Sequence, residues 1–358
     1  MEKPLHIVFI IQSLGLGGAE LSLVNLINAS DPSAFRFSII VFDKILTVAD
    51  RITRRDVTMV QVPKRGKISW HLVRDLKKIL VRLRPDVVHT HLFTADIWGI
   101  IAARQLMIPT VCTEHDVNKD YGFVRHLLKR LFSGYPDCYA SCSHSVAQFM
   151  RQKYGVTKPV KVIPNGVEVK KMGVLPPPNF IAPWRLGLCG RLVTQKKGQH
   201  VAIEALAMLK KHSWSLTMVG DGPDLIPLTH LVKLKGLESR ITFRSGNMPI
   251  EKYLEETAIV LVPSLFEGLG VVAREAMAAG RLVVASRTGG LAESIEDGQT
   301  GVLVEPGNTV LLARAIETIF NEPTQTQAMA AAGQAHAQTH FAMDLMVEAY
   351  AALYRGLV

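Results

Sequence analysis

Short apolar runs alternate with amphipathic stretches along the whole chain. In the first half, runs rich in β-branched residues predict strands at 6–11, 37–42, 57–62, 87–89, 110–113 and 138–141. Short runs separated by helical patterns indicate βαβ units and a parallel sheet. The second half repeats this rhythm, with strands expected at 184–189, 215–219, 241–243, 259–262, 282–286 and 301–304. The pattern therefore predicts an α/β protein with two Rossmann-like, doubly wound domains.

A proline-rich segment separates the two halves. Three successive prolines, Pro176 to Pro178, have no place inside a strand or helix. We therefore expect an N-terminal domain at 1–170, a linker at 171–183, a C-terminal domain at 184–340 and a final helix at 341–358. The apolar positions of that helix predict packing, but periodicity does not choose the domain. The N-terminal domain is our candidate.

Composition narrows the class of protein. A length of 358 residues exceeds the size at which one core stops growing, and 48% hydrophobic with 20% charged residues is typical of a globular α/β protein. The four cysteines show no C-x-x-C pair and no disulfide-like spacing, which favours a reducing, cytoplasmic compartment. No apolar run reaches the roughly 18 residues of a membrane span, so any membrane contact is expected at the surface.

The segment 263–280 carries the clearest chemical pattern. An apolar run enters the turn Gly268-Leu269-Gly270 and then a helix that Gly280 ends. The glycines let backbone N–H groups approach a ligand, and the partial positive charge of a helix N-terminus suits a diphosphate. Glu267 and Glu275 are separated by about 12 Å along an ideal helix, so they can contact the two ends of one ligand. Such a pair is suited to binding hydroxyl groups.

Several ordered motifs resemble those of family 4 of the retaining glycosyltransferases. Besides the two glutamates, they are Gly17-Gly18-Ala19-Glu20, Pro164-Asn165-Gly166-Val167-Glu168, Gly190-Arg191-Leu192, Lys196-Lys197-Gly198, Gly220-Asp221-Gly222-Pro223 and Gly289-Gly290-Leu291-Ala292-Glu293-Ser294-Ile295. The resemblance spans nearly the whole chain. It implies the GT-B fold, in which two Rossmann-like domains face each other across a cleft. It also implies retaining transfer of a hexosyl group from a UDP- or GDP-sugar to a polysaccharide or glycolipid acceptor.

The resemblance implies roles for individual residues of the second half. Arg191 and Lys197 would grip the donor diphosphate, Glu267 would bind the sugar hydroxyls and Glu275 would bind the ribose. Because two lysines precede Gly198, both Lys196 and Lys197 remain candidates for the clamp. No D-x-D motif is present, so we expect these cations to replace a metal ion and expect no cofactor.

Other positions are implied to surround the donor. The resemblance implies donor contacts for Gly17 and Gly18 near the phosphates, Gly246 near the base, His115 near the transferred sugar, and Gly268, Leu269 and Gly270. Residues 15–20 alone do not fit a dinucleotide fingerprint, because Glu20 stands at its third glycine position. A single histidine at a strand end, as His115 is, is as often structural.

Two stretches carry much of the formal charge of +10. Residues 64–84 hold eight basic residues against one acid, and residues 125–130 interleave cations with leucines. Two interpretations stay open: solvated helix faces packed on a sheet by their leucines, or a surface that docks peripherally on anionic lipid at the inner face of the membrane, beside a lipid-linked acceptor. We expect no nucleic-acid partner, because only 7% of residues are aromatic and none is interleaved with the basic stretches in an exposed pattern.

An alternative function on the same frame is that of a sugar-nucleotide epimerase or a phosphorylase. Either would need further acid/base residues, or a lysine that holds a cofactor such as pyridoxal phosphate.

Overall fold

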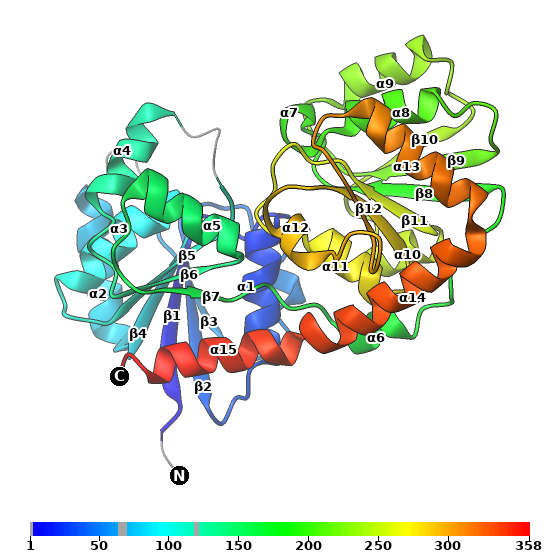
Figure 1. Cartoon of the computed structure of the whole chain (residues 1–358). Helices are drawn as coiled ribbons and strands as arrows, with labels where there is room; N and C mark the ends of the chain where they lie inside the picture. Colours follow the sequence, from blue (N-terminus) through cyan, green and yellow to red (C-terminus); the bar gives the residue numbers. More distant parts are fainter. Residues whose placement is uncertain (1–2, 64–69, 118–121) are drawn as a thin grey trace. The chain divides into compact units, whose positions relative to one another are not determined.

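The computed structural model describes residues 3–63, 70–117 and 122–358, and it divides into two compact units. Unit 1 comprises Met1–Gly166 together with Met343–Val358, and unit 2 comprises Val167–Ala342. Each unit is a twisted parallel sheet with helices on both faces (Figure 1). The predicted α/β class, with two Rossmann-like sheets, is confirmed.

The sheet of unit 1 has seven parallel strands in the order β3-β2-β1-β4-β5-β6-β7. They are β1 (Leu5–Ile11), β2 (Phe35–Val41), β3 (Thr58–Gln61), β4 (Val87–His91), β5 (Thr110–Glu114), β6 (Cys138–Ser141) and β7 (Val160–Val162). The apolar pattern predicts the first six strands within a few residues. It misses β7, because this edge strand has only three residues and the middle one, Lys161, is exposed.

Helices cover both faces of this sheet. They are α1 (Gly18–Ala29), α2 (Trp70–Leu83), α3 (Phe93–Arg104), α4 (Phe123–Leu131), α5 (His144–Phe149) and, from the end of the chain, α15 (Met343–Arg355). Met346, Tyr350 and Tyr354 of α15 are buried in the same apolar cluster as Phe9 and Phe37 of the sheet. The last helix, red in Figure 1, therefore packs beside α1 in unit 1.

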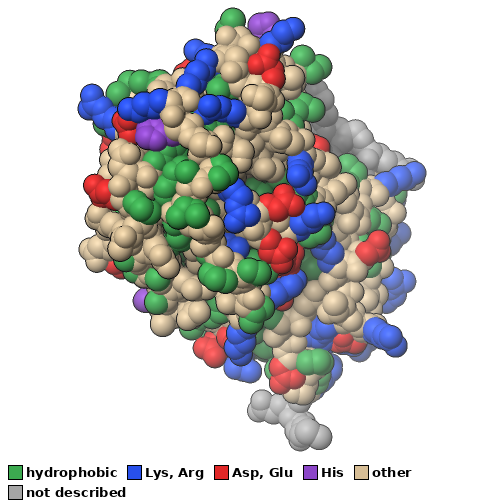
Figure 2. All heavy atoms as spheres, turned by 90° about the vertical axis from the view of Figure 1, so that its right-hand side faces the viewer, with side chains coloured by type: hydrophobic (Ala, Val, Ile, Leu, Met, Phe, Trp, Pro, Cys, Tyr) green, Lys and Arg blue, Asp and Glu red, His purple; other side chains and the backbone are tan. Residues whose placement is uncertain are grey.

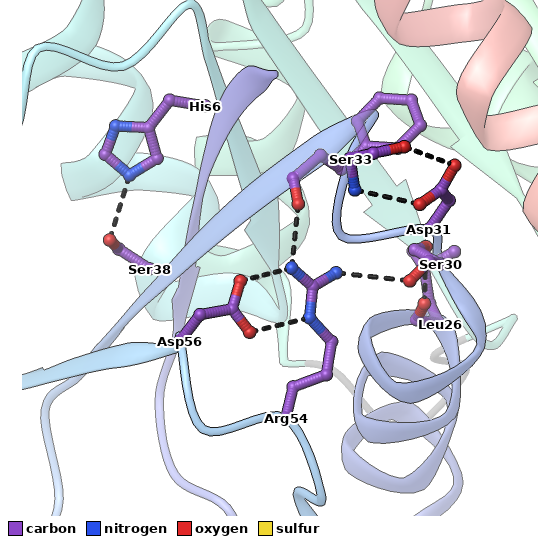
Figure 3. A network of polar contacts seen from close by, with 9 residues as sticks. His6, Leu26, Ser30, Asp31, Ser33, Ser38, Arg54 and Asp56 are labelled. Carbon is purple, nitrogen blue, oxygen red and sulfur yellow. Dashed lines mark hydrogen bonds and ion pairs between the residues drawn. The ribbon is translucent and has the colours of Figure 1, made fainter. Parts of the chain in front are cut away.

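A polar network fastens the amino edge of this sheet (Figure 3). Arg54 donates through Nη1 to the Ser30 carbonyl at 3.2 Å and through Nη2 to the Phe35 carbonyl at 2.8 Å. Its Nε donates to Asp56 at 2.9 Å. These bonds join the end of α1, the start of β2 and the loop before β3. They lie at the amino edge of the sheet. Ligands of such sheets bind at the opposite edge, at the carboxyl ends of the strands, so the role of these bonds is structural.

The sheet of unit 2 has six parallel strands in the order β10-β9-β8-β11-β12-β13. They are β8 (Trp184–Cys189), β9 (Trp214–Val219), β10 (Ile241–Arg244), β11 (Ile259–Val262), β12 (Leu282–Ser286) and β13 (Val302–Val304). All six follow the expected apolar runs. The strand order is that of a doubly wound nucleotide-binding sheet, and the order reverses between β8 and β11.

The helices of unit 2 pack on the two faces of its sheet. They are α6 (Val169–Gly173), α7 (Thr194–Lys197), α8 (Gln199–Ala207), α9 (Leu225–Leu234), α10 (Ile250–Glu255), α11 (Val271–Ala278), α12 (Gly289–Ser294), α13 (Thr309–Asn321) and α14 (Pro323–His340). One core cluster joins the sheet to α8, α9 and α13, and a second joins it to α6, α10, α11 and α14.

The expected linker, residues 171–183, belongs to unit 2 in the structure. The buried side chain of Arg281 holds it there, because its Nη2 donates to the Pro176 carbonyl at 2.9 Å while its Nε donates to the Leu254 carbonyl at 2.8 Å. The chain passes between the units at 166–167 and again at 342–343. In the part of the chain that the structure describes, no helix combines the length and apolar character needed to span a bilayer.

Candidate functional site

The candidate site of unit 2 lies where the strand order reverses. In doubly wound sheets, ligands bind at the carboxyl ends of the two strands that flank this point. Here those strands are β8 and β11, which are adjacent and parallel. Exposed Arg191 follows β8, and buried Glu267 follows β11. The sheet topology therefore places these two predicted residues at one edge of one sheet.

Close backbone packing brings the predicted lysines to the same edge. Gly198 has a φ of +63°, and a Cβ added to it would lie 2.0 Å from the Pro263 carbonyl oxygen. The amide of Leu265 donates to the Lys196 carbonyl at 2.8 Å. Only glycine allows this approach, which seats the end of α7 against the segment that follows β11.

An ion pair joins Lys197 to Glu267. The lysine Nζ lies 2.5 Å from Glu267 Oε2, and Ser264 Oγ donates to the same oxygen at 3.0 Å. Burial would raise the pKa of Glu267, but Lys197 and then Lys196 hold it below its usual value. Glu267 is therefore a carboxylate at neutral pH. Among the described residues, both of its hydrogen bonds fall on Oε2, which leaves Oε1 to accept from a ligand.

Lys196 is held differently from Lys197. Its Nζ lies over the Phe266 ring, 5.3 Å from the centroid. Burial lowers the pKa of this lysine, an effect that Glu267 partly opposes. The structure thus brings Lys197, rather than Lys196, into direct contact with the predicted sugar-binding carboxylate.

The glycine-rich turn before α11 is shaped by the start of α12. The Gly290 amide donates to the Gly268 carbonyl at 3.1 Å. A Cβ on Gly289 would lie 1.8 Å from the Glu267 carbonyl oxygen, and Gly270 has a φ of +82°. Leu269, the middle residue of this turn, is buried. Two glycine pairs distant in sequence therefore fix the backbone of Glu267 and the N-terminus of α11.

Glu275, on the second turn of α11, has a carboxyl group in a different environment. Burial raises its pKa to about 8, with further contributions from Glu251 and Glu168. Lys171 bridges those two glutamates, at 2.5 Å from Glu251 and 3.7 Å from Glu168. The two carboxyl groups of the E-x7-E motif therefore differ, since Glu267 is ionised and Glu275 is largely protonated at neutral pH.

Gly246 lies in the loop after β10. Its amide donates to Asp221 Oδ2 at 3.0 Å, and the Asp221 carbonyl accepts from the Leu192 amide at 3.0 Å. A Cβ on Gly222 would lie 2.3 Å from the Leu192 carbonyl oxygen. The Gly-Asp-Gly-Pro segment thus ties together the loops that follow β8, β9 and β10.

The remaining predicted residues lie at the carboxyl edge of the sheet in unit 1. Gly17 is the N-cap residue of α1, and Gly18 is its first residue. A Cβ on Gly17 would lie 2.4 Å from the Glu20 carboxylate, whereas one on Gly18 would meet nothing within 4 Å. The Glu20 carboxylate therefore folds back over the start of this helix.

His115, directly after β5, is paired with a histidine of the neighbouring strand. His91 Nδ1 and His115 Nε2 are 2.8 Å apart, and the two rings stack. Burial lowers the pKa of His115 to about 4 and that of His91 well below its usual value, so both rings are neutral. One ring must then donate its proton to the other. His115 Nδ1 and His91 Nε2 have no hydrogen-bond partner among the described residues.

Some supporting residues carry no signal in the sequence. Asp224 accepts from both the amide and the hydroxyl of Thr194, at 2.6 and 2.7 Å, and so fixes the start of α7. Gln199 Nε2 donates to the Arg191 carbonyl at 2.9 Å. Each pair joins positions that come together only in the fold. Among residues 3–63, 70–117 and 122–358, no three His, Cys, Asp or Glu side chains are grouped to hold a metal ion.

The two basic stretches differ in which side chains they bury: α2 buries leucines, whereas the one buried side chain of α4 is Lys129. In α2, Leu72, Leu76 and Leu80 are buried on the sheet and the cations face solvent, as the simpler interpretation expects; residues 64–69 lie outside the described part. A depression of about 550 Å³ beside Arg74, Lys77 and Lys78 belongs to this surface and not to the β8/β11 edge. Figure 2 shows another face of the molecule, where Lys and Arg are interspersed with acidic and apolar side chains.

Comparisons with known proteins agree with this fold. The family "Glycosyl transferases group 1" matches residues 183–322, and "Glycosyltransferase Family 4" matches residues 16–171. Glycogen synthase of Mycobacterium tuberculosis is 28% identical over 285 residues, which cover 76% of this chain and 69% of that protein. D-inositol 3-phosphate glycosyltransferase of Arthrobacter sp. is 26% identical over 301 residues, covering 75% and 70%.

Among solved structures, Anabaena HepE in complex with UDP and glucose superposes with a TM-score of 0.86 at 24% identity, over 99% of this chain and 100% of that one. At this identity the likeness shows the fold. The two family matches together span most of the chain and divide near the boundary between the units. The chain therefore belongs to the group 1 and family 4 glycosyltransferases of GT-B fold, and it is a glycosyltransferase.

Proposed function

We propose that this glycosyltransferase moves a sugar, with retention of anomeric configuration, from a UDP- or GDP-sugar to a polysaccharide or glycolipid acceptor. The observation that carries the proposal is the contact of Lys197 with Glu267 beside the glycine-opened start of α11. A cation and a helix N-terminus suit a diphosphate, and an ionised carboxylate suits sugar hydroxyls.

The proposed roles follow from these chemical properties. Arg191 and Lys197 stabilise the negative charge that grows on the departing diphosphate, as fixed cations in a partly enclosed site do most effectively. Glu267 accepts hydrogen bonds from the sugar through Oε1. Glu275 binds the ribose, and its raised pKa allows it to donate as well as accept.

A dedicated nucleophile is not assigned. In the proposed reaction, the departing diphosphate oxygen helps to deprotonate the acceptor hydroxyl on the same face of the sugar, so the protein's main tasks are orientation and charge stabilisation. Two basic side chains supply the positive charge, which supports a reaction that needs no metal ion. HepE, whose structures hold UDP, UDP-glucose and glucose, supports a UDP-sugar as the first donor class to test.

The acceptor proposal draws on relatives that act on different acceptors. Glycogen synthase, by its name, extends a polysaccharide, and the excess of basic residues supports an acceptor presented at an anionic membrane surface. We therefore propose that the enzyme works as a peripheral protein on such a surface when its acceptor is lipid-linked.

The test measures nucleotide release and product configuration with a panel of UDP- and GDP-sugars and glycan acceptors. We expect the Glu267→Gln and Lys197→Ala variants each to lower kcat/KM about 10²–10³-fold, as loss of one transition-state contact does. Lys233→Ala, which removes an exposed lysine of α9, is the matched control and should match wild type.

Turnover of either site variant within severalfold of wild type would show that the roles are wrong. NMR of the product should show the anomeric configuration of the donor, and inversion would contradict the retaining mechanism. Epimerised donor in the absence of acceptor would instead favour the alternative function.

A further inference from the structure

Two histidines at the ends of adjacent strands pair through their rings in unit 1. His91 is the last residue of β4 and His115 directly follows β5, so both lie at the carboxyl edge of the sheet. His91 Nδ1 and His115 Nε2 are 2.8 Å apart. His91 is 2% exposed, whereas His115 is half-buried. Because ligands of doubly wound sheets bind at this edge, His115 is the ring of the pair that a ligand can contact.

The two facing nitrogens share one proton. Burial lowers the pKa of each ring well below neutrality, so each ring is neutral and carries a single N–H. One of the facing nitrogens must donate and the other must accept. The hydrogen bond made by one ring nitrogen sets the protonation of the other. Two arrangements of tautomers therefore satisfy this contact.

The two arrangements leave an unpartnered N–H on different rings. If His115 donates, the proton of His91 lies on Nε2. If His91 donates, the proton of His115 lies on Nδ1. Neither His91 Nε2 nor His115 Nδ1 has a hydrogen-bond partner among the described residues. The direction of the hydrogen bond thus decides which of these two nitrogens is an unpaired donor.

The surroundings of His91 favour the arrangement in which it donates. Its ring packs against the rings of His89 and Phe9, with centroids 4.3 and 5.7 Å away. An N–H on Nε2 would be buried there without an acceptor, which is costly. Unpaired buried N–H groups are rarer in folded proteins than unpaired acceptors. With His91 as the donor, the unpaired N–H falls on His115, where a ligand oxygen can accept from it.

The third histidine of this cluster does not compete for the proton of His91. His89 Nδ1 lies 2.7 Å from the Tyr354 hydroxyl, and His89 Nε2 lies 2.6 Å from Thr113 Oγ1. Both ring nitrogens of His89 are therefore occupied. The contact between His89 and His91 is one of ring packing, and the polar contact of His91 is with His115.

We propose that His91 is a positioning residue, which donates its Nδ1–H to His115 Nε2 and so holds His115 as the tautomer with a proton on Nδ1. His115 then offers an N–H to an oxygen of a bound substrate. Because its Nε2 lone pair is occupied by His91, the same ring does not act as a general base. The inference rests on the proposed function in that this oxygen belongs to the sugar donor or to its acceptor.

Nitrogen chemical shifts report the tautomers directly. In full-length protein that contains isotope-labelled histidine, a two-bond proton–nitrogen correlation spectrum separates protonated from bare ring nitrogens. We expect Nδ1 to be protonated and Nε2 bare in both His91 and His115 at neutral pH. The signals are assigned by their loss in the His91→Asn and His115→Asn variants. A protonated Nε2 in His115, or a doubly protonated ring, overturns the proposal.

Two substitutions of His91 separate positioning from packing. His91→Asn keeps an amide N–H near the place of Nδ1, whereas His91→Leu removes the donor. We expect His91→Leu to lower kcat about tenfold, the equivalent of one lost hydrogen bond, and His91→Asn to recover most of this loss. Both variants remove the ring that packs on His89, so a purely structural role would affect both alike. Equal kcat in the two variants overturns the proposal.

A double-mutant cycle tests whether His91 acts through His115. In a His115→Ala background, His91→Leu should have no further effect on kcat/KM, because the residue that it positions is gone. An equal effect with and without His115 overturns the proposal. Tyr354→Phe is the matched control in the same cluster, since it removes the hydroxyl that contacts His89 and leaves the pair intact. It should lower the unfolding temperature and keep the wild-type kcat.

Failure of this inference is distinguishable from failure of the proposed function. The tautomers are read from wild-type protein without substrate, so the spectrum decides them even if no sugar is transferred. Where transfer is observed, the active sugar nucleotide and the active acceptor are then added separately. The His115 Nδ1 resonance should move with the one that supplies the oxygen. If it moves with neither, His115 does not donate to substrate and the inference fails.

Discussion

At the scale of single residues, the site depends on glycines whose neighbours leave no room for a side chain. Gly289 and Gly298 both have left-handed backbone conformations, with φ of +51° and +74°. At Gly289 a Cβ would collide with the Glu267 carbonyl oxygen, whereas at Gly298 it would meet nothing within 4 Å. Comparing substitutions at the two positions therefore separates the cost of backbone strain from the effect of displacing the Glu267 backbone.

We expect Gly289→Ala to weaken donor binding at least about tenfold, because the methyl group must push the Glu267 backbone out of place. Gly298→Ala carries a similar conformational cost, about 1 kcal/mol, without that collision. Calorimetric titration of the donor nucleotide, alongside thermal unfolding of each variant, measures both effects. Equal donor affinity in the two variants would show that Gly289 does not position Glu267.

The sequence predicts the residues of local motifs, but not the contacts between distant segments that position them. The glycine-rich turn and the E-x7-E spacing are local, so the pattern alone places them between β11 and α11. The contact of Gly289 with Glu267 joins residues of two different loops, and the pairing of His91 with His115 joins two neighbouring strands. Hydrophobic periodicity and turn-forming residues report local structure only. They therefore do not predict contacts between segments that are distant in the sequence.

At the scale of elements, α4 shows the limit of pattern analysis. Alternation of cations and leucines in 125–130 correctly indicates an amphipathic helix, but it does not tell which face is buried. The answer depends on Asp96 and Glu114, which belong to α3 and β5 and reach Lys129 only in the fold. The same holds for the linker at 171–183, whose prolines indicate a boundary but whose position is set by Arg281.

Lys129→Ala should lower the free energy of unfolding by about 3–5 kcal/mol, because it removes the cation that both buried carboxylates contact. Part of this loss should be recovered at mildly acidic pH, where the carboxylates can take up protons. Lys211→Ala, which breaks a pair with Glu317 at the surface, should leave the free energy of unfolding close to that of wild type. Urea unfolding of the full-length protein gives the comparison, and equal losses in both variants would contradict this role of Lys129.

At the scale of the whole molecule, the first six strands of unit 1 follow the same order as the six strands of unit 2, and unit 1 adds the edge strand β7. Each unit presents predicted residues at the carboxyl edge of its own sheet. Unit 2 by itself brings together the cations, the carboxylate and the glycine-opened helix that a nucleotide diphosphate needs. Unit 1 contributes the histidine pair. Under the proposed function, the donor therefore binds to residues of unit 2.

The most direct test of the central claim is thermal unfolding with UDP or GDP in the presence of a chelator. A nucleotide at about a hundred times its Kd should stabilise the protein by about 2.7 kcal/mol. We predict that one of the two raises the unfolding temperature equally with magnesium and with chelator, and that Arg191→Ala largely removes the shift. No shift with either nucleotide, or a shift that disappears with the chelator, would contradict a metal-independent cationic site in unit 2.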